Sequence, residues 1–146
     1  MHFEGHVPIR ADRQKTWDLL MDPQKVGTCG PGVEKVEVID DTRFKIHAKV
    51  GIGLIRATFA VEVERTEAIA PDHAVLKGTG KAPGSAVDGA AQMKLSDGPD
   101  GGTLMDWTAD VHIHGKLASV GARLIEGTAK KMIAQTFDCI RLKLEA

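Results

Sequence analysis

The sequence predicts an α+β fold in which a curved antiparallel sheet of six to seven strands wraps around one long C-terminal helix. Between residues 36 and 113, segments of alternating apolar and polar residues follow one another, as in strands with one face in the core. Residues 114–146 then place apolar residues at helical spacing. One sheet must cover its apolar face, and the last helix is the only long one available to do so.

The N-terminal part of the chain predicts one strand and two helices. Residues 2–10 alternate as a strand does. Asp12 suits the N-cap of a helix over 13–22, and Pro23 ends that helix because the residue before a proline avoids the helical region. Residues 23–32 predict a short second helix or turn.

Six further strands are expected from the alternation of apolar residues. They are centred on residues 36–38, 44–50, 57–64, 73–79, 87–95 and 105–113. Turn-forming glycine, proline and aspartate residues separate them. The predicted order is therefore β-α-α-β-β-β-β-β-β-α.

The long last helix has an apolar face that is interrupted by small and polar residues. Gly121, Thr128 and Gln135 are seven residues apart and therefore share one side of a helix. Either a neighbouring backbone comes very close there, or space is left for something else. The apolar residues also step by four from Ile125 to Phe137, so the stripe rotates around the helix as a curved sheet would require.

Composition narrows the class of protein. The 146 residues fit a single domain, 1–146, and the net charge of −1 argues against nucleic acid as a partner. No apolar run approaches the roughly 18 residues of a membrane span, and no targeting peptide is evident, so a cytoplasmic protein is expected. Cys29 and Cys139 lie far apart in the sequence and are expected to be reduced thiols.

Catalytic and metal-binding motifs are weak. His112 and His114 lie on the polar side of one strand, but zinc sites want three or four ligands. Asp106 and Asp110 share that side and suit solvation better than acid–base chemistry. Cys29 lacks a strongly basic neighbourhood. We expect no metal, no cofactor and no catalytic residue, which favours binding over catalysis.

Three segments resemble one known family closely. They are MHFEGHVPIRADRQKTWDLLMDP, CGPGVEKVE and GKLASVGARLIEGTAKKMIAQTF. Together they are similar to the CoxG family of carbon monoxide dehydrogenase proteins, which belongs to the START-like (SRPBCC) helix-grip superfamily. Gly30 departs from the leucine that many relatives carry there. The resemblance implies an accessory protein of a molybdenum-containing CO dehydrogenase or related hydroxylase, with a role in maturation, membrane recruitment or electron-acceptor delivery.

The resemblance also implies a cavity between the sheet and the last helix. The predicted ligand-binding residues are Phe59, Val61, Met93, Met105, Trp107 and Val111 on the sheet, and Leu117, Gly121, Leu124, Ile125, Thr128, Met132 and Gln135 on the helix. A mostly apolar site with few polar groups suits a lipophilic molecule, quinone- or lipid-like. Basic residues of the last helix allow peripheral contact with the inner face of the membrane. The alternatives are a START-like cyclase or hydrolase, and an assembly factor with a filled core; the oligomeric state is left open.

Overall fold

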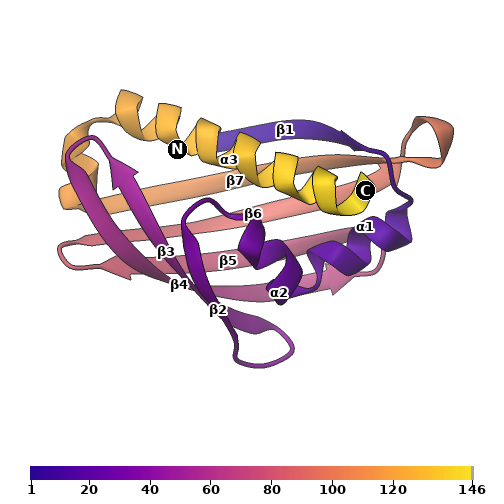
Figure 1. Cartoon of the computed structure of the whole chain (residues 1–146), viewed down its shortest axis with the longest axis horizontal. Coiled ribbons are helices and arrows are strands. Elements are labelled where there is room, and N and C mark those ends of the chain that lie inside the picture. Colours follow the sequence, from indigo (N-terminus) through magenta and orange to yellow (C-terminus); the bar gives the residue numbers. More distant parts are fainter. Residues whose placement is uncertain (146) are drawn as a thin grey trace.

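The predicted fold is confirmed. A computed structural model describes residues 1–145, and it contains one seven-stranded sheet in the order β1-β7-β6-β5-β4-β3-β2, with all neighbours antiparallel. Ala146, the last residue of the predicted helix, lies outside this range. Figure 1 shows the long helix α3 lying across one face of the sheet, with α1 and α2 beside its C-terminal end. The strands are β1 (His2–Ile9), β2 (Val33–Val38), β3 (Arg43–Ile52), β4 (Ile55–Ile69), β5 (His73–Ala82), β6 (Ser85–Asp97) and β7 (Thr103–Gly115).

The first two helices follow aspartate caps, and α1 begins where Asp12 predicts. Asp12 caps α1 (Arg13–Leu20), since its carboxylate accepts a hydrogen bond from the backbone N–H of Lys15 at 2.8 Å. Asp22 caps α2 (Pro23–Val26) in the same way, and a short 3-10 turn, η1 (Gly27–Cys29), follows it. A second 3-10 turn, η2 (Pro99–Gly101), joins β6 to β7.

The long helix starts later than its sequence pattern predicts. Strand β7 runs to Gly115, a 3-10 turn η3 (Lys116–Val120) follows, and α3 spans Ala122–Glu145. Gly121 separates the two with a φ of 98°, which a residue with a side chain adopts only with strain. The prediction of one helix from residue 114 was therefore wrong, and Gly121 interrupts the helical structure between η3 and α3.

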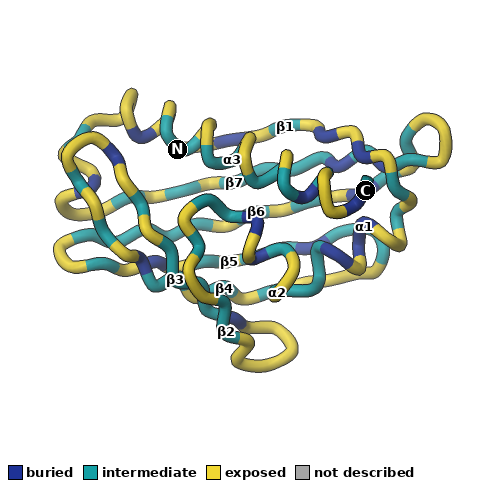
Figure 2. Tube along the Cα trace, viewed as in Figure 1, coloured by how far each residue is buried: buried dark blue, intermediate teal, exposed yellow. Residues whose placement is uncertain are grey.

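The interior is divided into two clusters along α3. One cluster packs the C-terminal half of α3, through Ile140 and Leu144, against α1 and against strands β1, β6 and β7. The other gathers Ile52, Phe59 and Leu117 at the opposite end of the sheet. Figure 2 shows buried backbone at both ends of the molecule. The first cluster contains ten buried residues, whereas the second contains three. We call the first the filled cluster.

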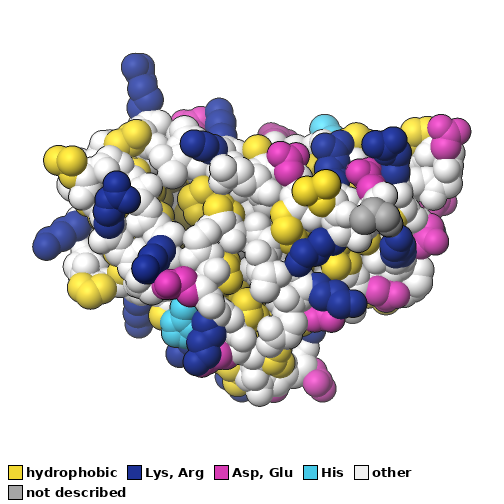
Figure 3. Space-filling view, in the orientation of Figure 1, with side chains coloured by type: hydrophobic (Ala, Val, Ile, Leu, Met, Phe, Trp, Pro, Cys, Tyr) yellow, Lys and Arg dark blue, Asp and Glu magenta, His cyan; other side chains and the backbone are white. Residues whose placement is uncertain are grey.

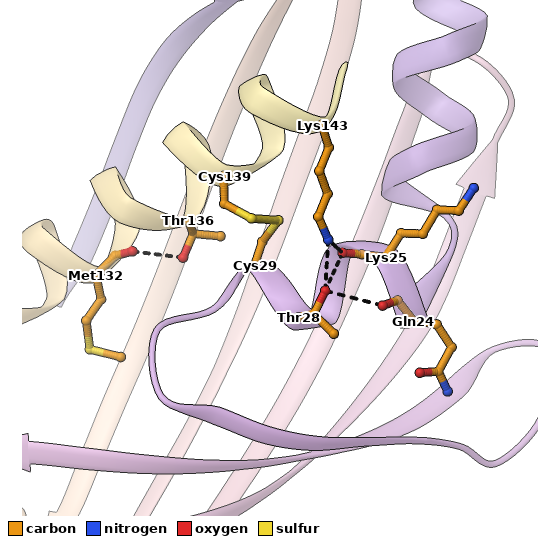
Figure 4. The surroundings of a disulfide bond; sticks show 8 residues. All are labelled: Gln24, Lys25, Thr28, Cys29, Met132, Thr136, Cys139 and Lys143. Atoms are coloured by element: carbon orange, nitrogen blue, oxygen red, sulfur yellow. Dashed lines mark hydrogen bonds between the residues drawn. A yellow bond between two sulfur atoms is a disulfide. The ribbon is translucent and has the colours of Figure 1, made fainter. Parts of the chain in front are cut away.

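A disulfide bond joins Cys29 in η1 to Cys139 in α3, with the two Cα atoms 5.4 Å apart. Beside it, Lys143 Nζ donates hydrogen bonds to the carbonyl of Lys25 (2.7 Å) and to Thr28 Oγ1 (2.9 Å), as Figure 4 shows. The expectation of reduced thiols was wrong, because the fold brings η1 under the C-terminal half of α3 across 110 residues of sequence. The bond fixes that half of the helix to the body of the protein.

Candidate ligand cavity between the sheet and helix α3

An apolar cavity lies between the concave face of the sheet and the N-terminal half of α3. Its volume is about 450 Å³, within the range of small-molecule sites. The surface that lines it is almost entirely apolar. Its walls include Phe59, Val61 and Val63 from β4, Val87 from β6, Val111 and Ile113 from β7, Leu117 from η3, and Ile125, Ala129 and Met132 from α3. We call this space the apolar cavity.

The floor of the apolar cavity is made of glycine. Gly78 on β5 lies directly opposite Gly89 on β6, and the same row continues to Val63 on one side and Val111 on the other. Residues directly opposite on antiparallel strands project to the same face, so two missing side chains leave the middle of this row empty. A Cβ at Gly78 would meet nothing closer than the Glu62 carbonyl oxygen at 3.8 Å. At Gly78 the space therefore exists because the sequence places no side chain there, whereas a Cβ at Gly89 would lie only 2.7 Å from the Asp110 carbonyl oxygen.

Sequence reasoning missed this floor. Neither Gly78 nor Gly89 is among the residues predicted to line the cavity. The observation that places them in the cavity is the strand register, which puts Gly78 and Gly89 in one row with the inward-facing Val63 and Val111. That register is visible only once the two strands are paired.

A second, more polar space adjoins the apolar cavity. It is a groove of about 790 Å³ between α3, the end of β3 and the Pro31-Gly32 turn, and it shares Val50 and Met132 with the apolar cavity. The cations Lys49, Arg123 and Lys131 also border it. We call this space the basic groove. A ligand could therefore place its lipophilic part in the apolar cavity and its polar part in the basic groove.

The structure brings together most of the predicted ligand-binding residues. Phe59, Val61, Val111, Leu117, Ile125 and Met132 line the apolar cavity. Gly121, Leu124, Thr128 and Gln135 line the basic groove, so the seven-residue spacing does place three small or polar residues along one opening. The Thr128 hydroxyl donates to the Leu124 carbonyl at 2.9 Å.

Three predicted wall residues lie elsewhere. Met105 is only 2% exposed and belongs to the filled cluster, against which Met93 and Trp107 also pack. The Trp107 ring lies over Gly5 and its centroid is 5.4 Å from that of Phe137. These three residues face the C-terminal half of α3, where side chains fill the space between helix and sheet.

The histidines and aspartates of the outer sheet face form exposed pairs. His2 Nδ1 lies 2.7 Å from an Asp110 carboxylate oxygen, and His6 pairs with Asp106 in the same manner. Asp110 raises the pKa of His2 chiefly through this hydrogen bond. His114 Nε2 lies 3.1 Å from Asp88.

These pairs are separated from the apolar cavity by the sheet. Within residues 1–145, no cluster of three or more His, Cys, Asp or Glu side chains could hold a metal ion. In the same range, no helix combines the length and the hydropathy needed to cross a bilayer.

Solved structures share this architecture. A conserved protein from Geobacillus kaustophilus superposes with a TM-score of 0.92 at 24% identity, covering 99% of this chain and 95% of that one. A START superfamily protein from Mycobacterium smegmatis gives 0.73 at 9% identity, with coverages of 99% and 97%. The Zhui aromatase/cyclase from Streptomyces sp. R1128 gives 0.71 at 15% identity, with coverages of 99% and 93%. These similarities establish the START-like helix-grip fold.

Sequence comparison identifies the family. No curated protein gave a significant match. The profile of the CoxG subunit of carbon monoxide dehydrogenase matches residues 5–145, which is nearly the whole chain. The motif GKLASVG within that match corresponds to the end of β7, η3 and the break at Gly121, the segment that closes one end of the apolar cavity. The chain therefore belongs to the CoxG family of carbon monoxide dehydrogenase proteins.

Proposed function

We propose that this chain is a non-catalytic accessory protein that holds a lipophilic molecule, quinone- or lipid-like, and serves a molybdenum-containing hydroxylase of the CO dehydrogenase type. The family and the START-like fold support an accessory or ligand-binding role in general. The observation that carries the finer proposal is the apolar cavity, whose glycine floor leaves room under α3 for a ligand. Its near absence of polar surface favours a hydrocarbon ring or chain over a charged substrate.

The proposed place of work is the cytoplasm, in peripheral contact with the inner face of the membrane where such ligands reside. Cytoplasmic thiols are usually kept reduced, so the Cys29–Cys139 bond bears on this point. Trapping the thiols in living cells with an alkylating reagent tests the compartment. A fully oxidised pair in cells would argue for an oxidising compartment instead.

Filling the apolar cavity tests the ligand site. The Gly78→Phe variant adds a ring to the cavity floor at a position where the backbone has room for a side chain. We expect it to fold and to lose at least tenfold in affinity for a prenylated quinone and for a long-chain fatty acid, measured by titration. Native mass spectrometry after organic extraction reports any lipophilic molecule that co-purifies with the unaltered protein.

The matched control is Thr79→Phe, which adds the same ring on the adjacent, exposed position of β5. It should bind as the unaltered protein does. Equal binding by both variants would remove the cavity from the proposal, and an absence of any lipophilic ligand would favour an assembly factor. Turnover of a bound apolar substrate would favour the cyclase or hydrolase alternative.

The proposed delivery of a quinone to a hydroxylase is tested separately. Adding the quinone-loaded protein to a molybdenum-containing CO dehydrogenase should raise the rate of quinone reduction over that with free quinone. The Gly78→Phe variant should give no such increase.

A further inference from the structure

One end of the molecule brings three turns together beside the basic groove. They are the β3–β4 turn (residues 52–56), the β5–β6 turn (81–86) and the segment from the end of β7 into α3 (114–124). The Leu117 N–H donates to Ser85 Oγ at 3.0 Å, and a Cβ at Gly53 would lie 3.1 Å from Leu124 Cδ2. Figure 1 shows these segments at the same end of the sheet, opposite α1. We call this surface the tip.

Two leucines of the tip form an exposed apolar patch. Leu54 is fully exposed, at 102%, and occupies a two-residue turn, since Ile52 and Ile55 pair on either side of it. Leu124 is 45% exposed and approaches Gly53 of the same turn. Isolated exposed leucines are common, but such turns usually carry polar residues or glycine. Two exposed leucines, one in this turn and one beside it, therefore indicate a contact with something apolar.

The lysine and arginine residues of the three tip segments outnumber the acidic residues beside them, which are Asp88, paired with His114, and Glu126. The tip segments contain Arg56, Lys81, Lys116 and Arg123, and no aspartate or glutamate, in a chain whose net charge is −1. All four side chains are exposed. Within the described residues, the ion pairs made by lysine and arginine all involve other cations. Figure 3 shows Lys and Arg side chains interspersed with hydrophobic ones at this end of the molecule.

We infer that the tip docks on an anionic lipid bilayer, with Leu54 and Leu124 entering the interface and the four cations facing acidic headgroups. Exposed leucines accompanied by cations that form no ion pair within the described residues suit a bilayer whose apolar interior lies under acidic headgroups. The basic groove opens at the same end and leads to the apolar cavity through Val50 and Met132. The inference deepens the proposed function, because it assigns the surface through which the carrier would meet the membrane holding its ligand.

Vesicle flotation of the full chain tests the inference without any cavity ligand. We expect binding to phosphatidylglycerol-containing vesicles, little binding to pure phosphatidylcholine, and weakening as salt rises. Leu54→Ser should weaken binding about tenfold, since it removes a buried leucine from the interface. Arg56→Gln with Lys81→Gln should weaken it about 25-fold, because each cation near an anionic surface contributes about fivefold; neither residue lines the basic groove or the apolar cavity.

Matched variants elsewhere on the surface serve as controls. Leu142 is 73% exposed near the C-terminal end of α3, so Leu142→Ser repeats the leucine change away from the tip. Lys77→Gln with Lys94→Gln removes two exposed charges from the sheet. Both controls should bind vesicles as the unaltered protein does. As a second measurement, the fluorescence of Leu54→Trp should shift to the blue on anionic vesicles, and that of Leu142→Trp should not.

Equal weakening by tip and control variants, or no binding to anionic vesicles, would overturn the inference. So would tip variants that lose binding to a hydroxylase while still binding vesicles. These results are separable from a failure of the proposed function, since the tip variants leave the apolar cavity intact and are titrated in parallel with a prenylated quinone. Retained quinone binding without vesicle binding would reject the tip alone.

Discussion

Thr128 and Gln135 are the neutral polar side chains of α3 that border the basic groove. The adjoining apolar cavity offers almost no polar contact. They can therefore orient the polar end of a ligand whose apolar part occupies the apolar cavity. Replacing them together by Val and Leu should weaken binding of a prenylated quinone about tenfold, the magnitude of one or two lost hydrogen bonds, and leave binding of a plain hydrocarbon unchanged. Competition titration measures both affinities.

Thr136, which follows Thr128 on α3, provides a matched control for this change. Thr136 donates its hydroxyl to the Met132 carbonyl at 2.8 Å, just as Thr128 donates to Leu124. Thr136→Val therefore removes the same kind of local hydrogen bond without altering the basic groove. If this variant changed selectivity as much as the paired variant does, the polar residues of the groove would have no orienting role.

Asp72 and His73 form a local ion pair with a defined pH range. The two side chains lie 2.8 Å apart, and this hydrogen bond raises the pKa of His73 above its ordinary 6.5 and lowers that of Asp72 below its ordinary 3.8. The histidine's contribution to stability is complete below pH 6.5 and is lost as the pH rises through the folded-state pKa. The aspartate's contribution is complete above pH 3.8 and is lost as the pH falls through its folded-state pKa.

The pair should therefore stabilise the fold most between pH 3.8 and 6.5. NMR titration should find a raised pKa for His73, and Asp72→Asn should lower it toward 6.5, with the remainder of any shift due to Glu67. A His73 pKa that did not respond to Asp72→Asn would contradict this account.

At the scale of elements, the hydrogen bonds and the disulfide that hold α3 are confined to its C-terminal half. Within residues 1–145, its hydrogen bonds to other elements all involve residues 141–145. Arg141 Nε donates to the Pro8 carbonyl, and the Glu145 carboxylate accepts from the Arg10 N–H. The disulfide at Cys139 adds to the same half. The half that covers the apolar cavity is held chiefly by Ile125, which is 5% exposed.

Reducing the disulfide should lower the free energy of unfolding by about 4 kcal/mol, because the bond closes a loop spanning 110 residues of sequence. Urea denaturation with and without reductant measures the change. The double variant Cys29→Ser with Cys139→Ser should match the reduced protein and should not respond to reductant. Its cavity should still bind ligand, because the bond lies in the filled half of the interior.

The sequence predicted the strands better than it predicted which part of α3 each strand residue faces or where α3 begins. Alternation identified every strand, because a strand with one solvated face repeats every two residues whatever it pairs with. The same alternation could not separate Trp107 from Val111, which lie on one face of β7 but under different halves of α3. The helix start was misplaced because the apolar spacing continues through η3, and only the positive φ of Gly121 ends it.

The disulfide and the cavity floor depend on tertiary contacts. Nothing near Cys29 indicates that η1 will reach Cys139, and nothing near Gly78 indicates that Gly89 will face it across two strands. Both became evident only with the pairing of distant segments.

At the scale of the whole molecule, the sheet is packed at one end and hollow at the other. The packed end contains the filled cluster, the disulfide and both short helices. The hollow end contains the apolar cavity, the basic groove and the tip. Stability and binding are therefore provided by different ends of one sheet, so a substitution at the tip should leave the packed end undisturbed.

The uneven attachment of α3 has a mechanical consequence. Within residues 1–145, the half of α3 that covers the apolar cavity is held by the packing of Ile125 and by its connection to η3, whereas the other half also has the disulfide and the hydrogen bonds to other elements. The break at Gly121 removes the stiffness that a continuous helix from η3 would have given the covering half. A movement confined to this half of α3 would widen the opening of the apolar cavity and leave the disulfide and all seven strands in place.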